Sequence, residues 1–127
     1  MPDGSVRMRL LLVDDDADVA TMYETQLAAQ GFEVIRARSG AEAIDRANRD
    51  APDLIYLDLG LPEMHGFDVL ERLRAAPATA RIPVVILTNY SEPELVARGR
   101  ELGAHDFLIK AHTPPGVPAE ATRKLVS

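Results

Sequence analysis

The sequence contains no cysteine and no tryptophan among its 127 residues. Without cysteine, disulfide frameworks and thiolate metal sites are excluded. Positive charge is also in deficit: 14 lysines and arginines stand against 20 aspartates and glutamates, and the net charge of −6 argues against a phosphate-backbone binder. No apolar run approaches the roughly 18 residues that a membrane span needs. We therefore expect a cytoplasmic protein that neither binds nucleic acid directly nor enters a membrane.

The apolar content is ordinary for a folded protein. Hydrophobic residues make up 46% of the chain and charged residues 27%, as in soluble globular domains. A chain of this length is long enough to bury a core without disulfide bonds or structural metal ions. We expect a single domain over residues 1–127.

Short apolar runs alternate with segments of helical spacing along the whole chain. Strands are predicted at residues 10–13, 32–37, 54–57, 84–87 and 107–109. Ser39 with Glu42, and Ser91 with Glu94, form capping boxes that predict the starts of two of the intervening helices. A fifth helix, at about 118–126, has only a weak signal. This alternation is typical of βαβ units and predicts an α/β fold: a doubly wound, five-stranded parallel sheet with helices on both faces.

Four of the predicted strands end at polar residues. The first strand runs into Asp14 and Asp15, the third into Asp58, the fourth into Thr88 and the fifth into Lys110. In an open parallel sheet the carboxyl ends of the strands share one edge, and ligands bind in the crevice there. The sequence therefore predicts a small pocket that holds three carboxylates, a hydroxyl and an ammonium group.

This set of strand-end residues resembles the receiver domain of bacterial two-component response regulators, of the chemotaxis-regulator type. The matching positions are Asp14 and Asp15 for the acid pair, Asp58 for the phosphoacceptor, Thr88 for the switch hydroxyl, Phe107 for the aromatic switch residue and Lys110 for the invariant lysine. The loop from Asp58 to Gly66 matches the D-x-x-L-P-x-x-x-G segment, in which Pro62 and Gly66 are expected to shape the backbone. The resemblance covers residues 8–112, is weaker beyond them, and implies the flavodoxin-like strand order 2-1-3-4-5.

The expected chemistry is phosphoryl transfer to a carboxylate. Three carboxylates in one pocket repel one another, so that they are expected to recruit a cation. Mg²⁺, or Mn²⁺ in its place, suits an all-oxygen site that keeps several waters. We expect Asp15, Asp58 and the backbone carbonyl of Gly60 to bind it, and Asp14 mostly to hold a bound water. Lys110 would then supply a second positive charge to the phosphoryl group.

The resemblance also implies a switch and a donor. A shift of Thr88 toward the phosphoryl group would let Phe107 move inward and alter the face built by the fourth helix, the fifth strand and the fifth helix. Phe107 has no hydroxyl, so this switch would depend on packing alone. The implied phosphodonor is a histidine kinase or a histidine phosphotransfer protein. The output partner is unknown.

Residues at three positions around the site distinguish this sequence within the family that it resembles. The family usually has proline after the invariant lysine, whereas Ala111 follows here, and a cis bond before alanine costs about 2.5–4 kcal/mol, so we predict a trans bond. Gly60 and Tyr90 stand at the positions that tune hydrolysis of the phosphoaspartate. Slow autodephosphorylation is our hypothesis, because Gly60 offers no side chain to orient water and Tyr90 would shield the site.

Two other functions fit parts of the sequence. One is a phosphorylation-independent interaction domain that keeps the receiver fold, which the substitution by Ala111 leaves open. The other is a metal phosphatase with an aspartate nucleophile, because Asp14 to Asp16 contain D-x-D as in the haloacid dehalogenase group. That group needs threonine or valine where Asp18 stands. His65, His105 and His112 share no spacing that indicates a site, and we interpret them as exposed loop residues.

Overall fold

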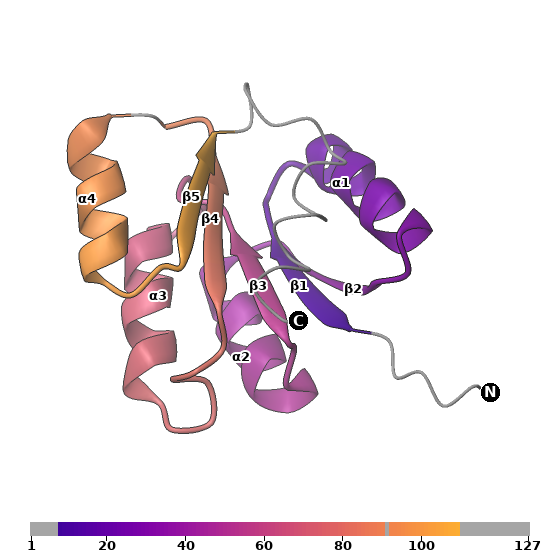
Figure 1. The fold of residues 1–127 in the computed structure, drawn as a ribbon, viewed down its shortest axis with the longest axis horizontal. Helices are drawn as coiled ribbons and strands as arrows, with labels where there is room; N and C mark the ends of the chain where they lie inside the picture. The colour runs from indigo at the N-terminus through magenta and orange to yellow at the C-terminus, as the bar shows by residue number, and fades with distance from the viewer. Residues whose placement is uncertain (1–7, 91, 110–127) are drawn as a thin grey trace.

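The computed structural model of the chain describes residues 8–90 and 92–109 (Figure 1). Lys110, Ala111 and the expected fifth helix lie outside the described residues. The predictions made for them therefore stay predictions, as does the extent of the domain.

Five strands and four helices alternate within the described residues. They are β1 (Arg9–Val13), α1 (Ala17–Ala29), β2 (Glu33–Ala37), α2 (Gly40–Asp50), β3 (Leu54–Leu57), α3 (Gly66–Ala75), β4 (Val84–Thr88), α4 (Pro93–Glu101) and β5 (Asp106–Ile109). All neighbouring strands are parallel, and their order in the sheet is β2-β1-β3-β4-β5. The predicted fold class and strand order are confirmed.

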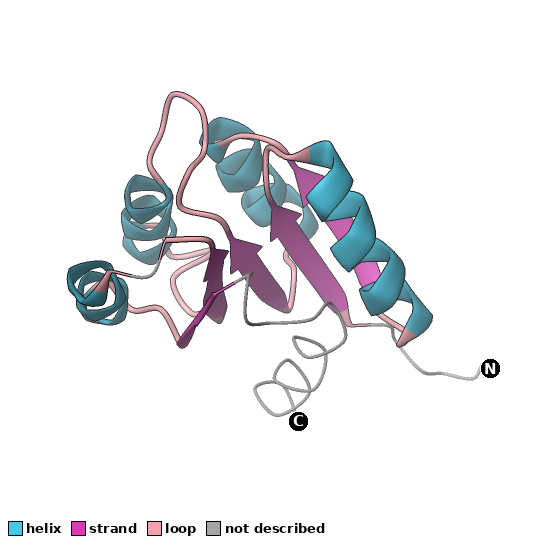
Figure 2. Ribbon diagram, turned by 90° about the horizontal axis from the view of Figure 1, so that it is seen from above, coloured by secondary structure: helices cyan, strands magenta, loops and turns pink. Residues whose placement is uncertain are grey.

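Helices cover both faces of the sheet (Figure 2), and the alternation of side chains along each strand divides the core into two layers. Leu10 and Leu12 of β1 pack under α1, against Tyr23 and Leu27. The intervening Leu11 faces the other layer, which α2 and α3 cover. Because both faces are covered, β1, β3 and β4 are buried on both sides, which is why they read as unbroken apolar runs.

The helix starts follow local capping chemistry at three of four places. Asp16 accepts hydrogen bonds from the backbone N–H groups of Asp18 and Val19 at 3.1 and 3.2 Å and so begins α1. The Ser39 hydroxyl accepts from the N–H of Glu42 at 3.2 Å at the start of α2, as predicted. His65 begins α3.

The predicted start of α4 at Ser91 is wrong. Its N-cap is Glu92, and among the described residues no side-chain hydrogen bond caps this helix. Pro93 takes the first helical position, where its fixed φ favours the helix and its missing N–H costs nothing. This proline, rather than the S-x-x-E pattern, therefore sets where α4 begins.

The connections at the opposite end of α3 are held together by one arginine. The guanidinium of Arg74 donates to the carbonyl oxygens of Ala80, Ile82 and Gly103 at 3.2, 2.8 and 2.9 Å. Burial lowers the pKa of Arg74. Arg74 thus joins α3, the segment before β4 and the turn after α4.

Over residues 8–90 and 92–109, the helices are too short and too polar for one of them to cross a bilayer.

Candidate functional site

Two of the predicted site residues leave adjacent strands at the point where the strand order reverses. Val13 of β1 pairs with Leu57 of β3, so that Asp14 and Asp58 follow side by side. The backbone N–H of Asp58 donates to the carbonyl of Val13 at 3.0 Å, which extends the pairing of the two strands to Asp58. The chain leaves β1 toward β2 on one side and β3 toward β4 on the other. Such a switch point opens a crevice at the carboxyl edge of the sheet.

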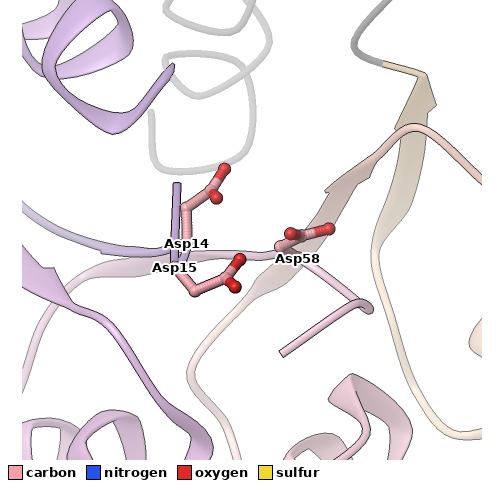
Figure 3. Close-up of side chains that lie close together, drawn as sticks. All are labelled: Asp14, Asp15 and Asp58. Atoms are coloured by element: carbon pink, nitrogen blue, oxygen red, sulfur yellow. The ribbon is translucent and has the colours of Figure 1, made fainter. Parts of the chain in front are cut away.

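Three carboxylates converge in this crevice (Figure 3). One oxygen of each of Asp14, Asp15 and Asp58 lies within 4.8 Å of the others. Asp14 is 3% exposed and Asp58 9%, whereas Asp15 is exposed to solvent. Oxygen ligands about 2.1 Å from one Mg²⁺ ion lie at most about 4.2 Å apart. A small inward shift, or a water between Asp14 and the ion, would therefore complete a site for one hard divalent cation.

The turn into α1 orients Asp14. Its Oδ1 accepts a hydrogen bond from the backbone N–H of Asp16 at 2.9 Å, and Asp16 in turn caps α1. The N–H of Asp14 donates to the carbonyl of Ala37 at the end of β2. One backbone N–H therefore orients the carboxylate, and the backbone that carries it is tied to β2, as a site that must present oxygens in a set direction requires.

The loop after Asp58 is held by a tight turn and a glycine. Glu63 has φ of +66°, and the N–H of Met64 donates to the carbonyl of Pro62 at 2.7 Å, which makes a γ-turn of the rare, strained kind. A Cβ on Gly66 would lie 2.7 Å from the carbonyl oxygen of Asp58. Only glycine fits there, so the expected shaping of this loop by Gly66 is confirmed, whereas Pro62 contributes the carbonyl of the γ-turn.

Tyr90 leans over the loop that carries Gly60. A Cβ on Gly60 would lie 3.2 Å from both Cε2 and the hydroxyl oxygen of Tyr90, whose side chain is 47% exposed. Thr88 is fully buried, and its Oγ accepts from the N–H of Tyr90 at 3.4 Å. The end of β4 thus lies next to the loop that follows β3.

Phe107 lies on the side of the sheet that α4 covers. Its strand position pairs with Ile86, and its ring is partly buried against the core layer that contains Ile86. The structure therefore brings together Asp14, Asp15 and Asp58, with Gly60 and Tyr90 beside them. It places Phe107 on α4's side, and Lys110 lies outside the described residues.

Sequence reasoning missed the role of one residue near the site. His65 is exposed, as expected, but its Nδ1 accepts from the N–H of Phe67 at 3.0 Å and so caps α3. Its ring also lies 4.9 Å from that of Phe67, centroid to centroid. Its place directly before Gly66 and an amphipathic segment was the available signal. Histidine is not among the residues most often found at N-caps.

Comparison with known proteins gives one consistent result. The family model described as "Response regulator receiver domain" matches residues 10–120. The gliding motility regulatory protein of Myxococcus xanthus is 37% identical over 119 residues, which are 94% of this chain but 15% of that protein. The transcriptional regulatory protein PrrA of Mycobacterium bovis is 40% identical over 110 residues, 87% of this chain and 46% of that protein. The chain thus spans about half, or less, of the length of these curated relatives.

Solved structures agree with the sequence matches, and two of them are covered by this chain over their full length. A response regulator described as putative, from Chloroflexus aurantiacus, superposes with a TM-score of 0.86 at 34% identity, over 96% of this chain and 100% of that one. The chemotaxis protein CheY4 of Vibrio cholerae superposes with a TM-score of 0.85 at 29% identity, again over 96% and 100%.

Proposed function

This chain belongs to the response regulator receiver domain family, and from this premise we propose that Asp58 accepts a phosphoryl group from a phosphohistidine donor. The observation that carries the proposal is the convergence of three carboxylate oxygens within 4.8 Å at the carboxyl edge of the sheet. This cluster fits the phosphoacceptor site of receiver domains. As a receiver domain the chain is a signalling module rather than a typical enzyme.

The transfer itself is a substitution at phosphorus. A carboxylate oxygen of Asp58 forms a bond to phosphorus as the phosphorus–nitrogen bond of the donor breaks, and the nitrogen keeps the electron pair. Receiver domains generally bind Mg²⁺ at their acidic cluster, and the three acids here fit such an ion. Asp15, Asp58 and the carbonyl of Gly60 would bind it, with Asp14 acting through a water. When bound, the ion neutralises charge on the phosphoryl oxygens.

The remaining site residues would act on the other phosphoryl oxygens and on the output face. Lys110 supplies positive charge, and the buried hydroxyl of Thr88 turns toward the new phosphoryl group. The vacated space then lets Phe107 move inward. What supports an output role for α4 is its open outer surface, where Pro93, Val96, Ala97 and Arg100 lie together.

Gly60 and Tyr90 would set the lifetime of the phosphoaspartate. Hydrolysis needs a water in line with the bond to phosphorus, and Gly60 has no side chain to orient one. The ring of Tyr90 stands 3.2 Å from the place of a Cβ on Gly60, where it shields this approach. Slow autodephosphorylation follows from these two features.

The partners are proposed from the family and from charge. The donor is a histidine kinase or a histidine phosphotransfer protein. Relatives such as the response regulator MtrA of Mycobacterium tuberculosis are named as DNA-binding, yet this chain spans 52% of that protein. With a net charge of −6 we expect no direct contact of this chain with nucleic acid. A phosphohistidine donor and the absence of cysteine suit the cytoplasm.

Incubation with acetyl phosphate and Mg²⁺, followed by intact mass measurement, tests the proposal. We expect the mass of one phosphoryl group to be added to the protein, and the addition to disappear in Asp58→Asn. Asp68→Asn is the matched control, because Asp68 is an exposed carboxylate in the first turn of α3. No gain in mass, with Mg²⁺ present in excess, would favour the phosphorylation-independent interaction domain instead.

A further inference from the structure

Gly99 is the buried position of α4 among its described residues, and it has no side chain. A Cβ at this position would lie 2.8 Å from Cδ1 of Ile86 on β4. It would also lie 3.2 Å from Cδ2 and 3.5 Å from Cε2 of Phe107 on β5. The first two distances are shorter than ordinary contacts between carbon atoms, and the third is an ordinary contact. The end of Ile86 and the ring of Phe107 would therefore both have to shift to admit any other residue at position 99.

A glycine inside a helix needs a packing reason, because it costs about 1 kcal/mol of helix propensity relative to alanine. The rest of α4 does not provide strong attachment. Its N-cap makes no side-chain hydrogen bond, and Leu95 and Val96 are only half-buried. Among the described residues, an ion pair between α4 and α3 joins Arg98 and Glu71 at 3.7 Å; both side chains are about half exposed, and such pairs contribute little. The contact at Gly99 is thus the close approach that fixes α4 to the sheet.

We propose that Gly99 leaves the space in which the Phe107 ring packs against α4. We call this contact between Gly99 and the Phe107 ring the seat, and we propose that it couples the position of α4 to the position of Phe107. Helix and ring fit together only because no Cβ stands between them. When the ring moves, Gly99 has no side chain with which to fill the space, so α4 shifts to restore contact with β4 and β5. Since Phe107 has no hydroxyl, this packing takes the place of a hydrogen bond in the switch. The coupling to phosphorylation rests on the function proposed above, whereas the seat itself does not.

Fluorine NMR tests the seat directly. The chain has three phenylalanines, Phe32, Phe67 and Phe107, so that 4-fluorophenylalanine labelling gives three signals, and Phe107→Leu assigns one of them. In the unphosphorylated protein, we expect Gly99→Ala to move the Phe107 signal and to leave the other two in place. The matched control is Ala97→Gly, which changes helix propensity at an exposed position of the same helix. It should leave all three signals in place.

The same samples test the coupling after acetyl phosphate and Mg²⁺ are added. The wild-type Phe107 signal should shift on phosphorylation, and Gly99→Ala should remove most of that shift while mass measurement shows an unchanged amount of phosphoryl group. If no variant takes up phosphate, the proposed function fails, but the first comparison still decides the seat.

A melting experiment guards against a variant that is merely unstable. Gly99→Ala should lower Tm by about 4 °C in the wild-type background, the size of a net loss of about 1 kcal/mol after the gain in helix propensity, and should lower it less in a Phe107→Leu background, where the contact with the ring is relieved and only that with Ile86 remains. The proposal is overturned if Gly99→Ala leaves the Phe107 signal unmoved, if Ala97→Gly moves it equally, or if the loss in Tm is the same in both backgrounds.

Discussion

Mutual repulsion among the three carboxylates should make the metal-free protein less stable than a variant that lacks one of them. Two unit charges 4.8 Å apart repel by about 0.9 kcal/mol at the permittivity of water and by about 3.5 kcal/mol at an effective value of 20. Asp15 is exposed, so the lower figure applies to each of its two pairs. Asp15→Asn should therefore stabilise the protein in a chelating buffer by at most about 1–2 kcal/mol, because other interactions of Asp14 and Asp58 offset part of the repulsion.

Mg²⁺ should make the wild type more stable than Asp15→Asn. A ligand that binds only the folded state stabilises it by about 1.4 kcal/mol at ten times its Kd and by about 2.7 kcal/mol at one hundred times. The wild type should gain Tm steadily as Mg²⁺ is added, whereas Asp15→Asn should gain much less. The assay is a thermal melt at a series of MgCl₂ concentrations, with NaCl adjusted to hold ionic strength constant because salt alone screens the charges.

Asp18→Asn is the matched control for this experiment. It removes the same charge from an exposed position in the first turn of α1, outside the cluster, and should respond to Mg²⁺ as the wild type does. The reasoning is refuted if Asp15→Asn melts below the wild type without metal, or if both proteins gain equally from Mg²⁺.

Three further predictions follow from contacts near the site and at the far end of α3. Tyr90→Ala should shorten the half-life of the phosphoaspartate severalfold, as measured by loss of radiolabelled phosphate, because it uncovers the approach over Gly60. His65→Ala should lower the free energy of unfolding in urea by about 1 kcal/mol, because the N–H of Phe67 loses its acceptor. Arg74→Ala should lower it by about 2–4 kcal/mol, because three carbonyl groups lose a charged donor.

Each of these predictions has its own control. A phenylalanine in place of Tyr90 should keep the slow decay, and equal decay rates for the alanine variant and the wild type would contradict the shielding. His65→Asn should retain most of the stability, since it offers another cap acceptor. Arg74→Lys should recover only part of the loss, because a single ammonium does not span three carbonyls as a planar guanidinium does. Full recovery by lysine would show that charge alone matters there.

The sheet and the acidic cluster could be predicted because both depend on simple patterns. Buried parallel strands read as apolar runs, and the polar residue that ends each run marks the edge where ligands bind. Asp14 and Asp58 were thus expected to meet, and the register of Val13 with Leu57 places them side by side. The tertiary contacts could not be predicted in this way. The acceptors of Arg74 come from two connections whose path depends on the whole fold.

The remaining differences between the sequence-based predictions and the structure depend on contacts of individual residues. Gly99 lies on the buried face of its helix, and its closeness to Phe107 follows only from how α4 lies on the sheet. The start of α4 was misplaced because Pro93 outweighs a capping pattern that fits the sequence equally well. His65 was not predicted to cap α3, since the acceptor is a ring nitrogen whose direction depends on the γ-turn before it.

The most direct measurement of the central claim is the location of the acyl phosphate. After incubation with Mg²⁺ and acetyl phosphate, borohydride reduction converts a phosphorylated aspartate to homoserine, which peptide mapping then places in the sequence. Conversion at Asp58 alone is the predicted result. Conversion at Asp14 would instead identify a phosphatase-type nucleophile at the end of β1, and would contradict the account.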